Sequence, residues 1–248
     1  MTRLELCAIA VMAKAPQAGR SKTRLTPRLS AEQAAGLSAA FLRDMTENIA
    51  AAGRTQRIDS FVAYAPAGTE GMFDGHLALG TGLILADGTL PMPDRVTGFG
   101  RCLLHAIETL LGEGYSAAVV LNSDSPTLPT AHLIRTAAWL AAPGDRAVLG
   151  PAEDGGYYLL GLKQAHAHMF ADITWSSENV AGQTRARAAE MGLQLLELPV
   201  WYDVDDAAGL DRLIEDLSGE GDQFSAPATA SWLADAGLLT PTTHRKYG

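Results

Sequence analysis

Hydrophobic and polar positions along the chain alternate between two patterns. Short, nearly continuous apolar runs at residues 4–12, 57–66 and 116–126 are typical of strands that are buried on both faces. Between the first two runs, residues 30–52 carry apolar side chains every three or four positions, which is the spacing of an amphipathic helix. Strands that alternate with helices predict a parallel or mostly parallel sheet with helices on both faces.

The same alternation continues through most of the chain. The first helix has a capping box at its start, because Gln33 follows Ser30 at the required spacing. Residues 66–98 are rich in glycine, proline and aspartate and are expected to be irregular. Later segments predict helices at 98–114, 129–142, 176–192 and 207–217, a strand–turn–strand unit at 145–162 and a strand within 193–206. The fourth of these five helices is expected to be capped by Ser176 or Ser177.

The chain is interpreted as one folded domain, residues 1–218, followed by an extension, residues 219–248. The extension predicts a linker, a short helix and a frayed end over the last eight residues. No repeat or low-complexity tract interrupts the domain.

Composition narrows the possible functions. The 248 residues are 47% hydrophobic and 19% charged, and the formal net charge is −9. An acidic chain is a poor candidate for nucleic-acid binding, which normally needs a basic face. Two isolated cysteines, Cys7 and Cys102, indicate reduced thiols and a cytoplasmic protein. No run approaches the ~20 apolar residues of a membrane span, and no signal peptide is predicted.

Charged residues gather where strands are expected to end. In open α/β sheets, ligands bind beyond the carboxyl ends of the strands. A basic loop follows the first strand, and acidic segments follow later strands at 122–126, 153–156 and 203–206. Cations beside carboxylates suit a diphosphate that is bridged to a divalent metal such as Mg²⁺ or Mn²⁺.

The basic loop contains Gly19, Lys22 and Thr23 in an order close to a phosphate-binding P-loop. The P-loop glycines are missing, however, because Pro16 and Ser21 stand at their positions. A different anion-binding loop and a solvated basic turn therefore both remain open.

The acidic segments also allow two interpretations. Asp124, before Ser-Pro, can be a metal ligand or can simply bond the backbone of its turn. Glu153 and Asp154, before two glycines, can hold hydroxyl groups or act as a base, and Asp-Gly is also a strong hairpin turn.

Five segments occur in a characteristic order: MAKAPQAGRSKTRL, LNSDSPTLP, GPAEDGGYYLLGL, ITWSSENV and WYDVDDAAGL. Taken together, they resemble a known bacterial family, the glycosyltransferase-like proteins of domain of unknown function 2064. The family is similar to nucleotide-diphospho-sugar transferases of the GT-A fold. It is also similar to 2-phospho-L-lactate guanylyltransferase and the molybdenum cofactor guanylyltransferase. The resemblance implies a single-domain, three-layer α/β sandwich with a mostly parallel central sheet. The resemblance covers about residues 5–215.

The resemblance also implies roles for individual residues. Asp124 resembles the first metal ligand and a catalytic residue, with Asp205 as the second ligand and Asp203 as its alternative. The residues implied to bind the nucleotide are Lys14, Ala15, Gly19, Arg20, Lys22, Arg24 and Ser123. Those implied on the sugar or acceptor side are Glu153 and Asp154, both as catalytic residues, and Gly155, Gly156, Tyr157 and Trp175.

The chain departs from the family pattern in two motifs, and residues 219–248 extend beyond the usual end of the family pattern. Where the family shows Gly-Glu-Arg, this chain has Gly100, Arg101 and Cys102, so the arginine is displaced by one position. That shift turns a side chain ~100° around a helix. Residues 206–209 replace a Thr-Pro-Glu-Asp segment, so the helix after the acidic loop begins differently.

These observations predict a metal-dependent transferase that uses a nucleotide-activated donor. Glycosyl transfer from a nucleotide sugar to a small acceptor is the favoured reaction. Nucleotidyl transfer with release of pyrophosphate is the alternative. Two further hypotheses are a nucleotide-binding protein without transferase activity and an α/β scaffold without a ligand.

Overall fold

A single seven-stranded sheet forms the centre of the protein. The computed structural model describes residues 6–26, 28–219 and 221–239. The strands lie in the order β3-β2-β1-β4-β6-β5-β7, and only β6 runs antiparallel to its neighbours. This is the mostly parallel α/β sheet that the sequence predicts. The strands are β1 (Cys7–Lys14), β2 (Ile58–Ala65), β3 (Gly82–Leu85), β4 (Ala117–Leu121), β5 (Arg146–Pro151), β6 (Tyr157–Leu162) and β7 (Gln194–Glu197).

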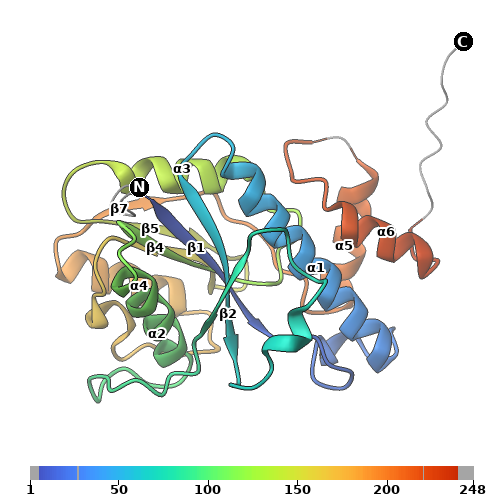
Figure 1. Cartoon of the computed structure of the whole chain (residues 1–248), viewed down its shortest axis with the longest axis horizontal. Helices are drawn as coiled ribbons and strands as arrows, with labels where there is room; N and C mark the ends of the chain where they lie inside the picture. The colour runs from blue at the N-terminus through green and yellow to red at the C-terminus, as the bar shows by residue number, and fades with distance from the viewer. Residues whose placement is uncertain (1–5, 27, 220, 240–248) are drawn as a thin grey trace, which may run out of the picture.

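Helices cover both faces of the sheet and give three layers (Figure 1). Successive residues of β1 point to opposite faces, as the two-residue period of a strand requires. Ile9 packs in one core with α1 and α3, and Ala10 packs in the other core with α2 and α4. The helices are α1 (Ala31–Ala52), α2 (Phe99–Gly112), α3 (Thr130–Ala141), α4 (Val180–Glu190), α5 (Ala207–Ser218) and α6 (Pro227–Asp235).

The start of α1 confirms the predicted capping box. The Ser30 hydroxyl accepts a hydrogen bond from the Gln33 backbone N–H, at 3.1 Å. The Gln33 side-chain oxygen accepts one from the Ser30 backbone N–H, at 2.8 Å. Two N–H groups that a helix leaves without partners are thereby satisfied.

Two local predictions were wrong. Residues 66–98 are not irregular throughout, because β3 extends the sheet by pairing in parallel with β2. The helix predicted at 176–192 begins at Val180, after Asn179, and neither Ser176 nor Ser177 is its N-cap. Instead, the Ser177 hydroxyl donates to the Thr174 carbonyl, at 2.7 Å, and stabilises the preceding turn.

The segment after α5 folds back onto α1. Helix α6 packs against α1, and the buried Asp44 carboxylate of α1 accepts hydrogen bonds from the backbone N–H groups of Ala228, at 2.9 Å, and Thr229, at 2.7 Å. These bonds satisfy the first turn of α6, which has no side-chain cap of its own. The predicted frayed end, residues 241–248, lies outside the described residues.

Across the described part of the chain, none of the helices is both long enough and apolar enough to cross a membrane.

Candidate functional site

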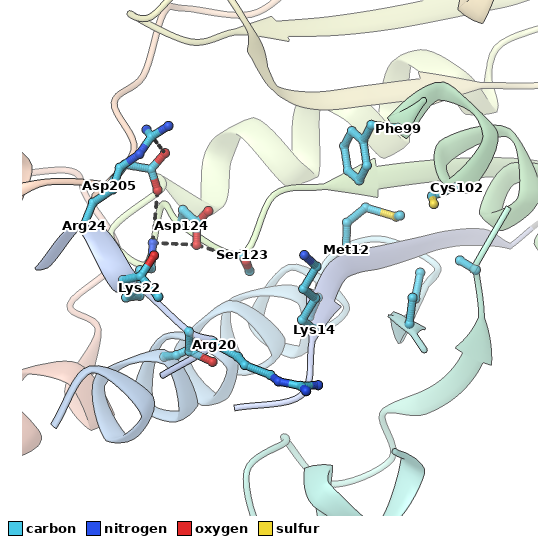
Figure 2. A pocket seen from close by; sticks show the side chains of 17 residues that line it. Met12, Lys14, Arg20, Lys22, Arg24, Phe99, Cys102, Ser123, Asp124 and Asp205 are labelled. Atoms are coloured by element: carbon cyan, nitrogen blue, oxygen red, sulfur yellow. Dashed lines mark hydrogen bonds and ion pairs between the residues drawn. The ribbon is translucent and has the colours of Figure 1, made fainter. Parts of the chain in front are cut away.

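A cavity of about 430 Å³ lies at the carboxyl ends of β1, β2 and β4. Three parallel strands end at the same edge of the sheet, so the loops that follow them meet there. The loop after β7 joins them through Asp205. Figure 2 shows the cavity with Lys22, Asp124 and Asp205 on one side and Met12, Phe99 and Cys102 on another. Polar and charged lining residues are Lys14, Arg20, Ser21, Lys22, Thr23, Arg24, Ser38, Ser123, Asp124 and Asp205.

The basic loop is held in shape by its own hydrogen bonds. The backbone N–H groups of Arg20 and Ser21 both donate to the Gln17 carbonyl, at 3.0 Å. The Ser21 hydroxyl accepts a bond from the Gln17 backbone N–H, also at 3.0 Å. Lys22 follows with a left-handed backbone, φ 48° and ψ 41°, and the chain then enters the short 3₁₀ helix Thr23–Leu25. This turn places the Lys22 side chain inside the protein, where it is only 6% exposed.

The Lys22 ammonium joins three loops. It lies 2.6 Å from Asp124 Oδ1, 2.6 Å from the Val204 carbonyl oxygen and 3.4 Å from Asp205 Oδ1. An ammonium has three N–H donors, and three protein oxygens lie within reach of them. Lys22 therefore neutralises the acidic residues from within the protein (Figure 2).

Three other cations face the cavity more openly. Arg24 is 77% exposed and lies 3.9 Å from Asp205 Oδ2. Lys14, at the end of β1, and Arg20 are also exposed, and Figure 2 shows them away from the Lys22 ion pairs. Neither Lys14 nor Arg20 makes an ion pair with any residue that the structure describes. These cations are placed to meet an anion that enters the cavity.

Asp124 is fixed by its neighbours. Its Oδ1 atom accepts a hydrogen bond from the Ser123 hydroxyl, at 3.0 Å, in addition to the contact with Lys22. Its backbone carbonyl accepts a bond from the Val204 N–H, at 2.8 Å. The loop after β4 and the loop after β7 are thus joined through both backbone and side chain.

Asp203 does not line the cavity, but the acidic residues around it change the pKa of its carboxyl group. Burial, which is the main cause, and the nearby Asp205, Asp154 and Asp124 carboxylates together raise the pKa of Asp203 from 3.8 to about 6. A carboxyl group surrounded by other carboxylates loses part of its charge near neutral pH.

The donor set fits a magnesium or manganese ion. Asp124 and Asp205 come from different loops, yet their oxygens reach one ammonium, so the two carboxylates already converge on a positive charge. Residues 6–26, 28–219 and 221–239 contain no group of three or more side chains that could hold a metal by themselves. Mg²⁺ is commonly held by one or two carboxylates together with phosphate oxygens, and Asp124 and Asp205 supply two carboxylates.

Several residues implied by the resemblance lie outside the cavity. Glu153 pairs with Arg212, at 2.6 Å, and the Asp154 carboxylate accepts a bond from the Gly156 backbone N–H, at 2.8 Å. Gly155 packs against the backbone of Glu178: a Cβ atom there would lie 2.1 Å from the Glu178 carbonyl oxygen. Within the basic loop, Ala15 is buried in the core, and Gly19 adopts φ 75° at an exposed turn.

A second cavity, of about 160 Å³, adjoins the first. Tyr157 lines it, whereas Trp175 stands behind, edge-on to both Tyr157 and Phe99. Burial raises the pKa of the Tyr157 hydroxyl, which therefore stays protonated. Phe99 lines both cavities and was missed by sequence reasoning. Phe99 stands between two glycines at the start of a predicted helix, and this sequence feature could have indicated a role for it. In the structure its side chain is 51% exposed.

The displaced arginine has a structural partner. Arg101 donates to the carbonyl oxygens of Gly88 and Leu90, each at 2.9 Å. It therefore holds the loop that precedes α2 and does not line either cavity.

Comparisons with solved structures agree with this fold. A candidate nucleotide-diphospho-sugar transferase from Desulfovibrio desulfuricans G20 is similar with a TM-score of 0.78 and 25% identity, over 97% of this chain and 100% of the other. A cytidylyltransferase from Leptospira borgpetersenii serovar Hardjo-bovis (strain JB197) has a TM-score of 0.52 and 10% identity, over 96% and 98% of the two chains. A CMP:2-keto-3-deoxy-manno-octonic acid synthetase complexed with CTP has a TM-score of 0.52 and 13% identity, over 86% and 98%.

A search of curated proteins gave no match. The model of one protein family, described as "Uncharacterized protein conserved in bacteria (DUF2064)", matches residues 48–177, just over half of the chain. The match spans β2 to the loop before α4 and includes Asp124 and the β5–β6 unit. The chain belongs to this bacterial family.

Proposed function

We propose that the protein is a metal-dependent transferase that binds a nucleotide-activated donor. The observation that carries this proposal is the 430 Å³ cavity at the sheet edge, which combines exposed cations with two convergent carboxylates. Its volume is within the range of ligand pockets, about 300–1,000 Å³. The similarity to a candidate nucleotide-diphospho-sugar transferase over nearly the whole chain supports the same class.

The residues of the cavity have distinct roles in this proposal. Lys14, Arg20 and Arg24 bind the phosphates, because they are exposed cations on the cavity wall. Asp124 and Asp205 hold Mg²⁺ or Mn²⁺. The bound ion would neutralise charge on the diphosphate and on the leaving group. Lys22 keeps the two carboxylates in place and limits their mutual repulsion.

Glycosyl transfer to a small acceptor is the reaction we favour. The smaller cavity beside Asp124 provides space for a second substrate next to the proposed diphosphate site. Nucleotidyl transfer is the alternative, because the chain shares its fold with a cytidylyltransferase and with a synthetase that binds CTP. The free thiols of Cys7 and Cys102 support a reducing, cytoplasmic setting.

A thermal-shift screen tests the proposal. The protein is heated with UDP-, GDP- and CMP-sugars and with nucleoside triphosphates, each with and without Mn²⁺. A donor at 100 times its Kd stabilises a protein by about 2.7 kcal/mol, which corresponds to roughly 5–10 °C for a chain of this size. A larger shift with diphospho-sugars favours glycosyl transfer. A larger shift with triphosphates, together with pyrophosphate release, favours nucleotidyl transfer.

Asp124→Asn is the matched variant for this screen. The amide keeps the size of the side chain and removes its charge, so the Mn²⁺-dependent part of the shift should be lost. The part that needs no metal should persist, because the exposed cations are unchanged. If no nucleotide shifts the wild-type protein under either condition, the proposed function is wrong.

A further inference from the structure

The Lys22 ammonium is surrounded by protein groups in the way that a bound cation is. Oxygens of Asp124, Val204 and Asp205 lie 2.6, 2.6 and 3.4 Å from its nitrogen. The nitrogen also lies 5.1 Å from the ring centroid of the buried Phe41, within the range of a cation–π contact. Two of the three oxygens belong to the proposed metal ligands. Lys22 therefore places a positive charge beside both of these carboxylates.

The contact atom of Asp124 is already in full use. Its Oδ1 accepts hydrogen bonds from Lys22, at 2.6 Å, and from the Ser123 hydroxyl, at 3.0 Å, and a carboxylate oxygen has about two lone pairs. A divalent ion bound to the same atom at about 2.1 Å would stand within about 5 Å of the ammonium. Two cations at that distance repel each other. Lys22 and a metal ion therefore compete for Asp124.

Charge also limits the binding of a metal ion by itself. Asp124 and Asp205 carry two negative charges, and Lys22 already offsets one of them. A divalent ion alone would give this group of side chains an excess of positive charge, and three exposed cations line the same cavity. A diphosphate supplies the negative charge that balances both. The site therefore favours an ion that arrives together with a diphosphate.

A diphosphate in the cavity would also give Lys22 another partner. The Lys22 side chain forms part of the cavity wall. A lysine ammonium stands at the end of a flexible four-carbon stem and binds phosphate oxygens as a point charge. The preceding turn is held by bonds between Gln17, Arg20 and Ser21, none of which involves the Lys22 side chain. The ammonium can therefore change partners while the loop keeps its shape.

We propose that Lys22 exchanges partners when the donor binds. Its ammonium pairs with Asp124 and Asp205 in the free protein, and it pairs with a phosphate oxygen when a metal ion and a diphosphate enter together. The exchange is ionic and breaks no covalent bond. The free protein consequently binds the metal ion alone only weakly, and the metal–diphosphate complex is the form that it takes up. This inference rests on the proposed function, from which it takes the metal ion and the diphosphate.

Binding of Mn²⁺ alone, measured from the electron paramagnetic resonance signal of the free ion, is the first test. Lys22→Met should bind Mn²⁺ at least tenfold more tightly than wild type. That is the factor expected if the ammonium leaves the carboxylates free in about one wild-type molecule in ten. Lys14→Met is the matched control, because it removes the same charge from the same cavity but frees neither carboxylate. Its screened, through-space effect should be less than about threefold.

Binding of magnesium pyrophosphate, measured by titration calorimetry, is the second test. Here Lys22→Met should bind at least fivefold more weakly than wild type, because a charge-assisted contact with a phosphate oxygen is lost. A residue that only positions the carboxylates would weaken both ligands when it is removed. A residue that only binds phosphate would leave the affinity for Mn²⁺ alone unchanged. Circular dichroism checks the fold, and Lys22→Gln, whose amide can still donate to Asp124, repeats both tests if the methionine variant does not fold.

The two tests separate this inference from the proposed function. If the Lys22 variant gains no more Mn²⁺ affinity than Lys14→Met, or binds magnesium pyrophosphate as tightly as wild type, the partner exchange is wrong. Wild-type binding of magnesium pyrophosphate would in that case leave the transferase proposal standing. If wild type does not bind magnesium pyrophosphate and the Lys22 variant does not bind Mn²⁺, both the exchange and the proposed metal–diphosphate site are wrong.

Discussion

Lys22 shows how the position of one charge changes its role. Its neighbours Arg20 and Arg24 are exposed, whereas the Lys22 side chain is 6% exposed and contacts two carboxylates. A buried cation of this kind mainly compensates the charge of the half-buried carboxylates beside it, because breaking such a pair leaves the partner charge without compensation. The basic loop thus contains exposed cations, which we propose bind the phosphates, and one buried cation that pairs with carboxylates of the protein itself.

Lys22→Met is expected to lower the free energy of unfolding by about 2 kcal/mol, less than for a fully buried pair because Asp124 and Asp205 are 30% and 43% exposed. A divalent cation can replace the missing charge, so Mn²⁺ should recover more stability in the variant than it adds to wild type. Urea unfolding with and without Mn²⁺ measures both effects. Equal effects of Mn²⁺ in the two proteins would contradict a metal site at these carboxylates.

Arg24→Ala should affect nucleotide affinity and leave stability almost unchanged. The side chain is 77% exposed and only 3.9 Å from Asp205, so stability should change by less than about 0.5 kcal/mol. Nucleotide affinity, measured by titration calorimetry, should fall about three- to tenfold because a phosphate contact is lost. Arg54→Ala, which removes an exposed arginine next to the far end of α1, is the control and should leave affinity unchanged. Unchanged affinity in Arg24→Ala would identify Arg24 as part of a solvated turn.

Asp203→Asn should change the pH dependence of stability. Because the folded-state pKa is raised from 3.8 to about 6, Asp203 favours folding below 3.8, and this contribution is lost as pH rises to about 6. The amide cannot ionise, so the Tm advantage of the variant should grow from pH 4.5 to about pH 6 and then stay constant to pH 8. A Tm difference that is the same at every pH would show that the pKa of Asp203 is not raised.

Elements of the fold were predictable where one local pattern decides the structure. The strand pattern of β1 and the capping box of α1 are examples, and alternation of such elements was enough for the sheet type. β3 was missed because four residues, Gly82–Leu85, are too few for a clear pattern and form a strand only by pairing with β2. The start of α4 depends on contacts with the β5–β6 turn, and the residues that make these contacts are more than 20 positions apart in the sequence, as Gly155 and Glu178 are.

The candidate site was predictable to a similar degree. The rule that ligands bind beyond the carboxyl ends of strands correctly predicted that the loops after β1, β4 and β7 meet at one edge of the sheet. The inward turn of Lys22 depends on a left-handed backbone and on acceptors about 180 residues away, at Val204 and Asp205, and no local pattern contains that information. Glu153 and Asp154 are engaged outside the cavity for the same reason, since Arg212 comes from α5.

Gly155→Ala tests the contact between the β5–β6 turn and the segment just before α4. The residue has φ 87°, and a Cβ atom would lie 2.1 Å from the Glu178 carbonyl oxygen, which is backbone and cannot move freely. The free energy of unfolding should fall by about 3 kcal/mol. Gly182→Ala, within α4, is the matched control: nothing lies within 4 Å of its Cβ position, so it should stabilise the helix by up to about 1 kcal/mol. Equal effects would show that the contact with Glu178 is not rigid.

At the scale of the whole molecule, the first helix, α1, contacts the last described helix, α6. Asp44→Ala removes the acceptor for the first N–H groups of α6 and should lower stability by about 1 kcal/mol, as the loss of a helix cap does. Glu47→Ala, one turn along the same helix, removes only a surface pair with Arg43 and should cost less than about 0.5 kcal/mol. Urea unfolding and limited proteolysis of residues 219–226 measure the difference. Equal stability of the two variants would show that Asp44 does not cap α6.

The same contact has a consequence for protein synthesis. The ribosome makes α6 after every other described element, and until then Asp44 and the apolar residues Leu37 and Phe41 of α1 have no cover from Leu233. A chain cut short before Pro227 would expose this apolar surface beside an unpaired carboxylate. Proteases that sample exposed apolar segments could therefore distinguish truncated chains from complete ones, although every residue of the proposed donor site would be present in both.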